Sequence, residues 1–224
     1  MRKLIRGIIE FRKNRRPEYI ETFARLALAQ APDALFIACS DSRVAANLFA
    51  STEPGDLFVI RNVGNMIPRA NAKGVPDRDS SVAAAIEFSS IGLKVRDIVV
   101  CGHSECGAMK ALVEGRSLGP SLNSWLTHGK EPLRLLEAGT RMKAELAPHN
   151  HLSQLNVLHQ LENLRSYPII RERVDAGTLR LNAWWFDIAQ AEVSAYEESA
   201  ERFVVIDEAE GQRLLARQDK EENA

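Results

Sequence analysis

The chain has 224 residues, with 29 basic and 30 acidic side chains and a formal net charge of −1. This length suits a single α/β domain, spanning residues 1–224, with a sizeable core, and the balanced charge creates no field for nucleic acid. No apolar run approaches the roughly 20 residues of a membrane-spanning helix. Three cysteines are too few for a disulfide framework, so we expect the reducing cytoplasm and a role in metal binding, catalysis or packing.

The first 30 residues predict two helices. Residues 1–16 carry seven basic side chains against one acid, with apolar residues at helical spacing. A transit peptide has a similar character but is usually rich in serine, which this segment lacks. Residues 18–30 repeat the helical spacing between two prolines. We expect residues 1–30 to form a helical arm that packs on a partner subunit.

From residue 34 onward, predicted strands and helices alternate. Short apolar runs begin at residues 34, 57 and 97 and are typical of buried parallel strands, while residues 81–93 predict a helix. Right-handed crossovers then give an α/β fold with a central, mainly parallel sheet flanked by helices. In such sheets, ligands bind beyond the carboxyl ends of the strands. We therefore expect "CSDSR" (39–43) and "GHSEC" (102–106) to lie at the same edge.

The remaining chain predicts further helices, a strand and a hairpin at the carboxyl-terminal end of the domain. The charged last residues predict a frayed tail. These segments are helices around 131–145 and 152–166, a strand at 178–188, a hairpin of 192–196 and 202–206, and the tail at 213–224.

The segment "GHSEC" is open to two interpretations. It is close to G-x-S-x-G, the nucleophile elbow of serine hydrolases, with Ser104 as nucleophile. However, Cys106 replaces the last glycine, whose small size lets helix and strand crowd together at the turn. Asp187 could serve as the acid of a triad, but no histidine follows His159 in the sequence. The elbow therefore lacks its general base, and we disfavour it.

The alternative is a metal site. His103 and Cys106 have metal-ligand spacing, and the other strand end offers Cys39 and Asp41. Two thiolates and one imidazole suit zinc and leave a fourth place for water or a carboxylate, which is the arrangement of catalytic zinc sites. A single buried cysteine is usually a packing residue, and we interpret Cys101 in this way.

These motifs carry a family resemblance. "CSDSR" followed by "HSEC" resembles the paired C-x-D-x-R and H-x-x-C motifs of the β-class carbonic anhydrases, and the likeness extends to "EPGDLFVIRNVGNMIP" and "GHSECGAMK". The chain is most similar to the cyanobacterial type. The resemblance implies one zinc ion per subunit, carbon dioxide and bicarbonate as substrates, and an amino-terminal arm wrapped around a twofold partner. A homodimer is thus expected at least, while a tetramer or higher oligomer and carboxysome association stay open.

The family's functional residues can be carried over to matching positions. The resemblance implies that Cys39, His103 and Cys106 bind zinc and that Asp41 and Arg43 form a catalytic dyad, with Asp41 also able to take the fourth zinc position. It implies further residues that contact the substrate, namely Gln30, Phe58, Val63 and Gly107.

The expected reaction is the hydration of carbon dioxide by zinc-bound hydroxide. Zinc lowers the pKa of a bound water from 15.7 to about 7, and two thiolates should leave that water less acidic than three imidazoles would. We therefore expect activity to rise above neutral pH. Alternatives are hydrolysis of carbon disulfide or carbonyl sulfide at the same zinc, and a non-catalytic protein that binds zinc or bicarbonate.

Two positions depart from the family pattern. Phe88 stands where many relatives have tyrosine, and we expect a modest effect. Phe36 stands where the subgroup with an inhibitory bicarbonate site has tryptophan, so we do not expect that regulation, although Arg61 is retained. Four further histidines are interpreted as solvated or packed: His128, His149, His151 and His159.

Overall fold

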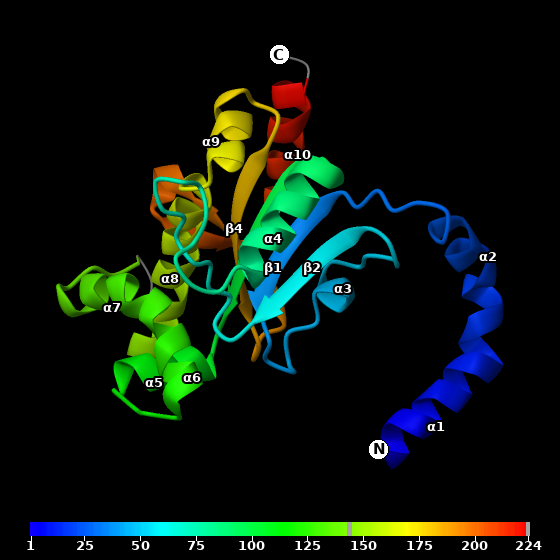
Figure 1. The fold of residues 1–224 in the computed structure, drawn as a ribbon, viewed down its shortest axis with the longest axis horizontal. Helices are drawn as coiled ribbons and strands as arrows, with labels where there is room; N and C mark the ends of the chain where they lie inside the picture. The colour runs from blue at the N-terminus through cyan, green and yellow to red at the C-terminus, as the bar shows by residue number, and fades with distance from the viewer. Residues whose placement is uncertain (143–144, 223–224) are drawn as a thin grey trace.

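The computed structural model describes residues 1–142 and 145–222 and has a six-stranded sheet at its centre. The strand order is β2-β1-β3-β4-β5-β6, in which the first four strands run parallel and the last two antiparallel (Figure 1). The mainly parallel sheet and the carboxyl-terminal hairpin are therefore confirmed. The strands are β1 (Ala34–Cys39), β2 (Leu57–Asn62), β3 (Asp97–His103), β4 (Arg180–Asp187), β5 (Glu192–Glu197) and β6 (Arg202–Val205).

The central strands are buried on both faces because their successive side chains point to opposite sides of the sheet. In β1, Leu35 and Ile37 pack in one core cluster, whereas Phe36 and Ala38 pack in another. The first face is covered by helices and the second by the short helix α3. The covering helices are α4 (Ser81–Glu87), its π-helical continuation η2 (Phe88–Gly92), α8 (Pro148–Arg165) and α9 (Pro168–Asp175) on one side, and α3 (Ala46–Phe49) on the other.

A group of shorter helices lies beside α8, near the carboxyl ends of the parallel strands. The helix predicted around 131–145 ends at Glu137, and residues 143–144 of that prediction lie outside the described residues. Helix α8 begins at Pro148, earlier than predicted, because proline is well suited to the first turn of a helix. The shorter helices are α5 (Gly107–Val113), α6 (Pro120–Trp125), the 3-10 helix η3 (Leu126–Gly129) and α7 (Lys130–Glu137).

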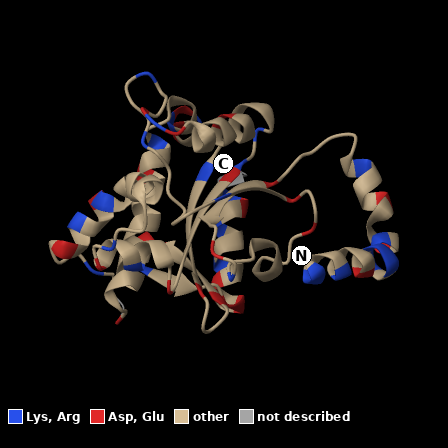
Figure 2. Cartoon of the chain, turned by 60° about the horizontal axis from the view of Figure 1, so that its bottom comes forward, with Lys and Arg blue, Asp and Glu red and all other residues tan. Residues whose placement is uncertain are grey.

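The amino-terminal arm consists of α1 (Arg2–Glu10), the π-helical η1 (Phe11–Arg15) and α2 (Arg16–Leu26), and none of its residues is buried. It extends away from the rest of the chain (Figure 1), and several basic residues lie along it (Figure 2). Helix α2 stops four residues before the predicted end, so Gln30 lies in the link to β1. The exposed apolar residues of the arm include Leu4, Ile5, Ile8, Ile9, Ile20 and Phe23.

The carboxyl-terminal residues differ from the prediction. A frayed tail is expected from residue 213, but the structure has a helix, α10 (Glu208–Glu222), preceded further upstream by the 3-10 helix η4 (Glu198–Ala200). Asp207 caps this helix, since its carboxylate accepts the N–H of Glu210 at 2.9 Å. Arg213 pairs with Glu210 and Glu197. The charges that suggested fraying thus support a helix instead.

Candidate metal centre

The predicted ligands meet where β1 and β3 end. The ligand atoms of Cys39, His103 and Cys106 all lie within 4.8 Å of one another, and all three residues are buried. Since β1 has β2 on one side and β3 on the other, the strand order reverses here, which is where α/β sheets bind ligands. None of the helices in residues 1–142 and 145–222 has the length and apolar character needed to cross a bilayer.

His103 is held by one hydrogen bond to its ring and one to its backbone carbonyl. Its Nδ1 lies 2.8 Å from the carbonyl oxygen of Ser104, and a carbonyl can only accept, so Nδ1 carries the proton. Ser153 in turn donates its hydroxyl to the carbonyl of His103 at 2.8 Å. Within the described residues, the buried Nε2 atom has no hydrogen-bond partner. This orphaned lone pair is what a metal ligand requires.

The two thiols complete the donor set. The hydrogen bond from the Cys106 thiol lowers the pKa of Cys39, although burial opposes the shift. The same contact with the Cys39 thiolate, together with burial, raises the pKa of Cys106. Only one of the two sulfurs can therefore ionise unless a cation stabilises both. Two thiolates and an imidazole fit zinc, which has a positive charge that would remove this conflict.

Asp41 is held beside the group by Arg43. The guanidinium of Arg43 donates to both carboxylate oxygens, at 2.9 and 2.7 Å, and its backbone N–H donates at 3.0 Å. These bonds hold the pKa of Asp41 well below its usual range. The carboxylate lies 4.0 Å from Nε2 of His103. Asp41 and Arg43 therefore form a doubly hydrogen-bonded ion pair beside the group.

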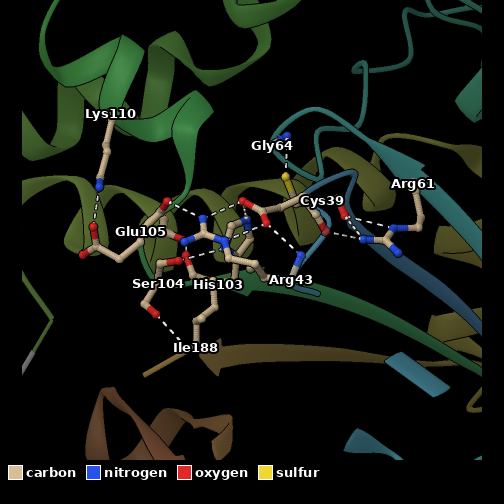
Figure 3. Close-up of polar contacts among 12 residues, drawn as sticks. Cys39, Arg43, Arg61, Gly64, His103, Ser104, Glu105, Lys110 and Ile188 are labelled. Atoms are coloured by element: carbon tan, nitrogen blue, oxygen red, sulfur yellow. Dashed lines mark hydrogen bonds and ion pairs between the residues drawn. The ribbon is translucent and has the colours of Figure 1, made fainter. Parts of the chain in front are cut away.

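Arg61 supports the same turn from β2. It donates to the carbonyl of Cys39 at 3.1 and 2.9 Å and to the carbonyl of Asp41 at 2.6 Å. Figure 3 shows the guanidinium of Arg61 beside the carbonyl of Cys39. Sequence reasoning connected Arg61 only with bicarbonate and missed this role, because no sequence pattern marks a side chain that binds backbone carbonyls.

The turn between His103 and Cys106 is held from α8. Its central residue, Glu105, has the left-handed φ of 59°, which is costly for a side-chain-bearing residue. The N–H of Glu105 donates to Asn150 at 2.8 Å, and its carboxylate binds Lys110 and His149. Lys110 and then His149 lower the pKa of Glu105 to about 2. His149 thus has a specific partner.

The hydrolase alternative is not supported by the geometry of Ser104. Its buried hydroxyl accepts the N–H of Ile188 at 2.9 Å and donates to Asp187 at 3.4 Å. Ser104 is therefore a turn residue that joins the ends of β3 and β4. Cys101 is fully buried, which raises its pKa to about 12, and it packs among apolar side chains as predicted.

The predicted substrate residues are only partly brought together. Val63 precedes Gly64, whose N–H lies 3.4 Å from the Cys39 sulfur, and Gly107 is an exposed residue that follows Cys106. Gln30 precedes β1, whereas Cys39 ends it, so the two lie at opposite ends of the strand. Phe58 pairs with Leu35 early in β2, away from the metal group. Within one chain, Gln30 and Phe58 therefore lie away from the group formed by Cys39, His103 and Cys106.

Known proteins resemble this chain in both sequence and fold. A family model for carbonic anhydrase matches residues 34–193. A carbonic anhydrase of Pseudomonas aeruginosa is 40% identical over 210 residues, covering 93% of each chain. The solved β-carbonic anhydrase CcaA superposes with a TM-score of 0.83 and 38% identity over 92% of this chain and 98% of its own. The chain belongs to the β-class carbonic anhydrase family.

Other members show the same likeness. A carbonic anhydrase of Synechocystis is 39% identical over 91% of this chain and 74% of its own length. Tetrameric β-carbonic anhydrases of Sordaria macrospora match with a TM-score of 0.73 and 29% identity over 87% of this chain and 95% of theirs. The predicted β-carbonic anhydrase family, enzyme class and α/β fold are confirmed.

Proposed function

We propose that the chain is a zinc enzyme that reversibly hydrates carbon dioxide to bicarbonate and a proton. The observation that carries this proposal is the buried group of Cys39, His103 and Cys106, with an unpartnered Nε2 and an ionised Asp41 beside it. Zinc, when bound by these three residues, would supply the positive charge that makes a water acidic near neutral pH.

Asp41 and Arg43 would orient the reacting groups. An ionised carboxylate can only accept hydrogen bonds, so Asp41 would accept one from the hydroxyl that attacks carbon dioxide. Arg43, by binding both carboxylate oxygens, would keep Asp41 from becoming a fourth zinc ligand. The exposed Gly107 begins α5, where backbone N–H groups lack helical partners, and it would donate to a substrate oxygen.

We propose that a second copy of the chain completes the substrate pocket. Gln30 and Phe58 lie away from their own metal group, and the apolar face of the arm is exposed. A twofold dimer would cover that face and bring both residues to the other subunit's site.

Three unpaired cysteines suit the cytoplasm, which we retain as the proposed location. Assembly into tetramers stays open.

Stopped-flow hydration of carbon dioxide from pH 6 to pH 9, with zinc content measured in parallel, tests the proposal. We expect wild-type activity to rise above neutral pH and to fall sharply in Asp41→Asn and Cys106→Ser. Equal rates in all three proteins would contradict it. Zinc binding without hydration would favour a non-catalytic zinc-binding protein. Faster turnover of carbon disulfide than of carbon dioxide would favour a carbon disulfide hydrolase.

We further propose that bicarbonate does not regulate this enzyme cooperatively. Phe36 lies among aromatic rings, 6.2 Å from Phe49 and 6.0 Å from Trp184 between ring centroids. Arg61 is engaged with the carbonyls of Cys39 and Asp41. These environments offer little to an anion. Rates measured against added bicarbonate should show simple product inhibition, and a sigmoidal dependence would contradict this proposal.

A further inference from the structure

Helix α8 carries a row of polar side chains that are buried against the site. Three leucines of this helix, Leu152, Leu155 and Leu164, are buried in the apolar core. The polar residues between them are no less buried, although burying a polar group is costly unless it is hydrogen-bonded. This row consists of Asn150, Ser153, Asn156, Gln160 and Asn163, which are 0–9% exposed.

The carboxyl-terminal half of this row binds the loop that follows β2. Asn156 donates to the carbonyl of Gly64 at 3.0 Å. Gln160 accepts the N–H of Ile67 at 2.7 Å and donates to the side-chain oxygen of Asn156 at 2.9 Å. Asn163 donates to the carbonyl of Ile67 at 3.0 Å. Linked amides of α8 therefore hold loop peptide groups that would otherwise be buried without partners.

This loop reaches the metal ligands through Gly64. The N–H of Gly64 lies 3.4 Å from the sulfur of Cys39. Gly64 has a φ of 80°, and a Cβ added to it would lie 3.1 Å from side-chain carbons of Ala108 and Met66. Glycine is thus required here, and its backbone approaches the sulfur closely (Figure 3).

We propose that Asn156 is a positioning residue for the metal centre, a role that rests on the proposed zinc site. Asn156 holds the carbonyl of Gly64, and this contact keeps the N–H of the same residue directed at Cys39. An N–H bond to a thiolate fixes the direction of its lone pairs and moderates its donor strength. Asn156 therefore acts through Gly64 on how tightly Cys39 binds zinc.

The test compares Asn156→Leu and Asn156→Ser with Leu164→Ala, a control in the same helix whose side chain is fully buried in the apolar core. Leucine removes both amide contacts, and the shorter serine provides a polar variant if leucine impairs folding. Zinc affinity is measured by chelator competition. The cobalt-substituted proteins are compared by their sulfur-to-cobalt charge-transfer band, and thermal unfolding reports stability.

We expect each Asn156 variant to weaken zinc binding about tenfold, at the low end of what partners of metal ligands contribute, and to shift the cobalt band. Leu164→Ala should lower the unfolding temperature and leave zinc affinity and the band unchanged. Unchanged affinity and band in both Asn156 variants, or an equal loss in the control, would overturn the role of Asn156 alone. A wild-type protein that binds no zinc would overturn the proposed function as well.

Discussion

The candidate metal ligands and the proposed substrate residues of this enzyme differ in how far one chain brings them together. Cys39, His103 and Cys106 are at most 5% exposed, and hydrogen bonds from within the chain orient them. Val63 is 40% exposed and Gly107 is exposed as well, and Gln30 lies at the opposite end of β1 from Cys39. The difference supports our two proposals, that folding of one chain builds the metal centre and that association of two chains completes the substrate pocket.

The exposed amino-terminal arm explains why the substrate pocket would need a second chain. Its apolar side chains have no core of their own, and exposed apolar surface of this extent marks an interface. The metal ligands follow strands that are buried on both sides. Changes to the ligands should therefore remove zinc and leave dimer formation intact. Changes to the arm should prevent dimer formation and leave zinc bound.

The largest effect is expected for Cys106→Ser. A serine hydroxyl is a much weaker zinc ligand than a thiolate, so the variant should lose zinc and its hydration rate should fall by about 10³-fold or more, given what zinc contributes to such sites. Metal analysis, stopped-flow rates and sedimentation should show an apo dimer. Cys101→Ser is the matched control and should keep its zinc. Retention of zinc by Cys106→Ser would contradict the assigned ligand set.

The arm variant Ile5→Glu/Ile8→Glu should have the next largest effect. Two charges on the apolar face should prevent dimer formation and lower the hydration rate about 10²-fold through loss of substrate positioning, with zinc content unchanged. Sedimentation velocity and metal analysis check both parts. Lys3→Glu changes charge on the opposite face of α1 and should remain dimeric. An active monomer would refute the shared pocket.

The third variant, Asp41→Asn, should lower the rate of carbon dioxide hydration without changing zinc binding or dimer formation. Without a carboxylate to accept the hydrogen bond, kcat should fall by about 10- to 100-fold, at or below the usual range for acid-base groups. Zinc content and dimer formation should match the wild type. The neighbouring Ser42→Ala serves as the control. A kcat equal to that of the wild type would exclude Asp41 from the reaction.

The smallest effect concerns Tyr167, which donates its hydroxyl to the carbonyl of Pro68 at 2.6 Å. Burial raises its pKa to about 12, so the unfolded chain loses this proton at lower pH than the folded one. Stability should therefore be fully present below about pH 10 and should fall between about pH 10 and 12, by up to about 3 kcal/mol. Urea unfolding of Tyr167→Phe should lack this loss. Equal pH dependence in both proteins would show that Tyr167 does not titrate in this way.

The sequence predicts the grouping of Cys39, His103 and Cys106 well because these residues lie at or just after the ends of two strands. The run at residues 97–103 coincides with β3, and the parallel arrangement places its end beside Cys39. The supporting residues could not be predicted. Asn156 lies between regularly spaced leucines, and a buried asparagine that binds a loop has the same sequence appearance as a solvated one. Arg61 binds backbone carbonyls, and Glu105 binds the side chains of Lys110 and His149. Neither kind of contact leaves a recognisable spacing in the sequence.

The shared pocket is tested most directly by co-expressing Cys106→Ser with Gln30→Leu. In a mixed dimer, the Gln30→Leu chain supplies an intact metal centre and the Cys106→Ser chain supplies an intact Gln30. Random pairing makes half of the dimers mixed, each with one intact site, so the account predicts recovery of about one quarter of the wild-type hydration rate. A rate no higher than the average of the two separate variants would contradict it.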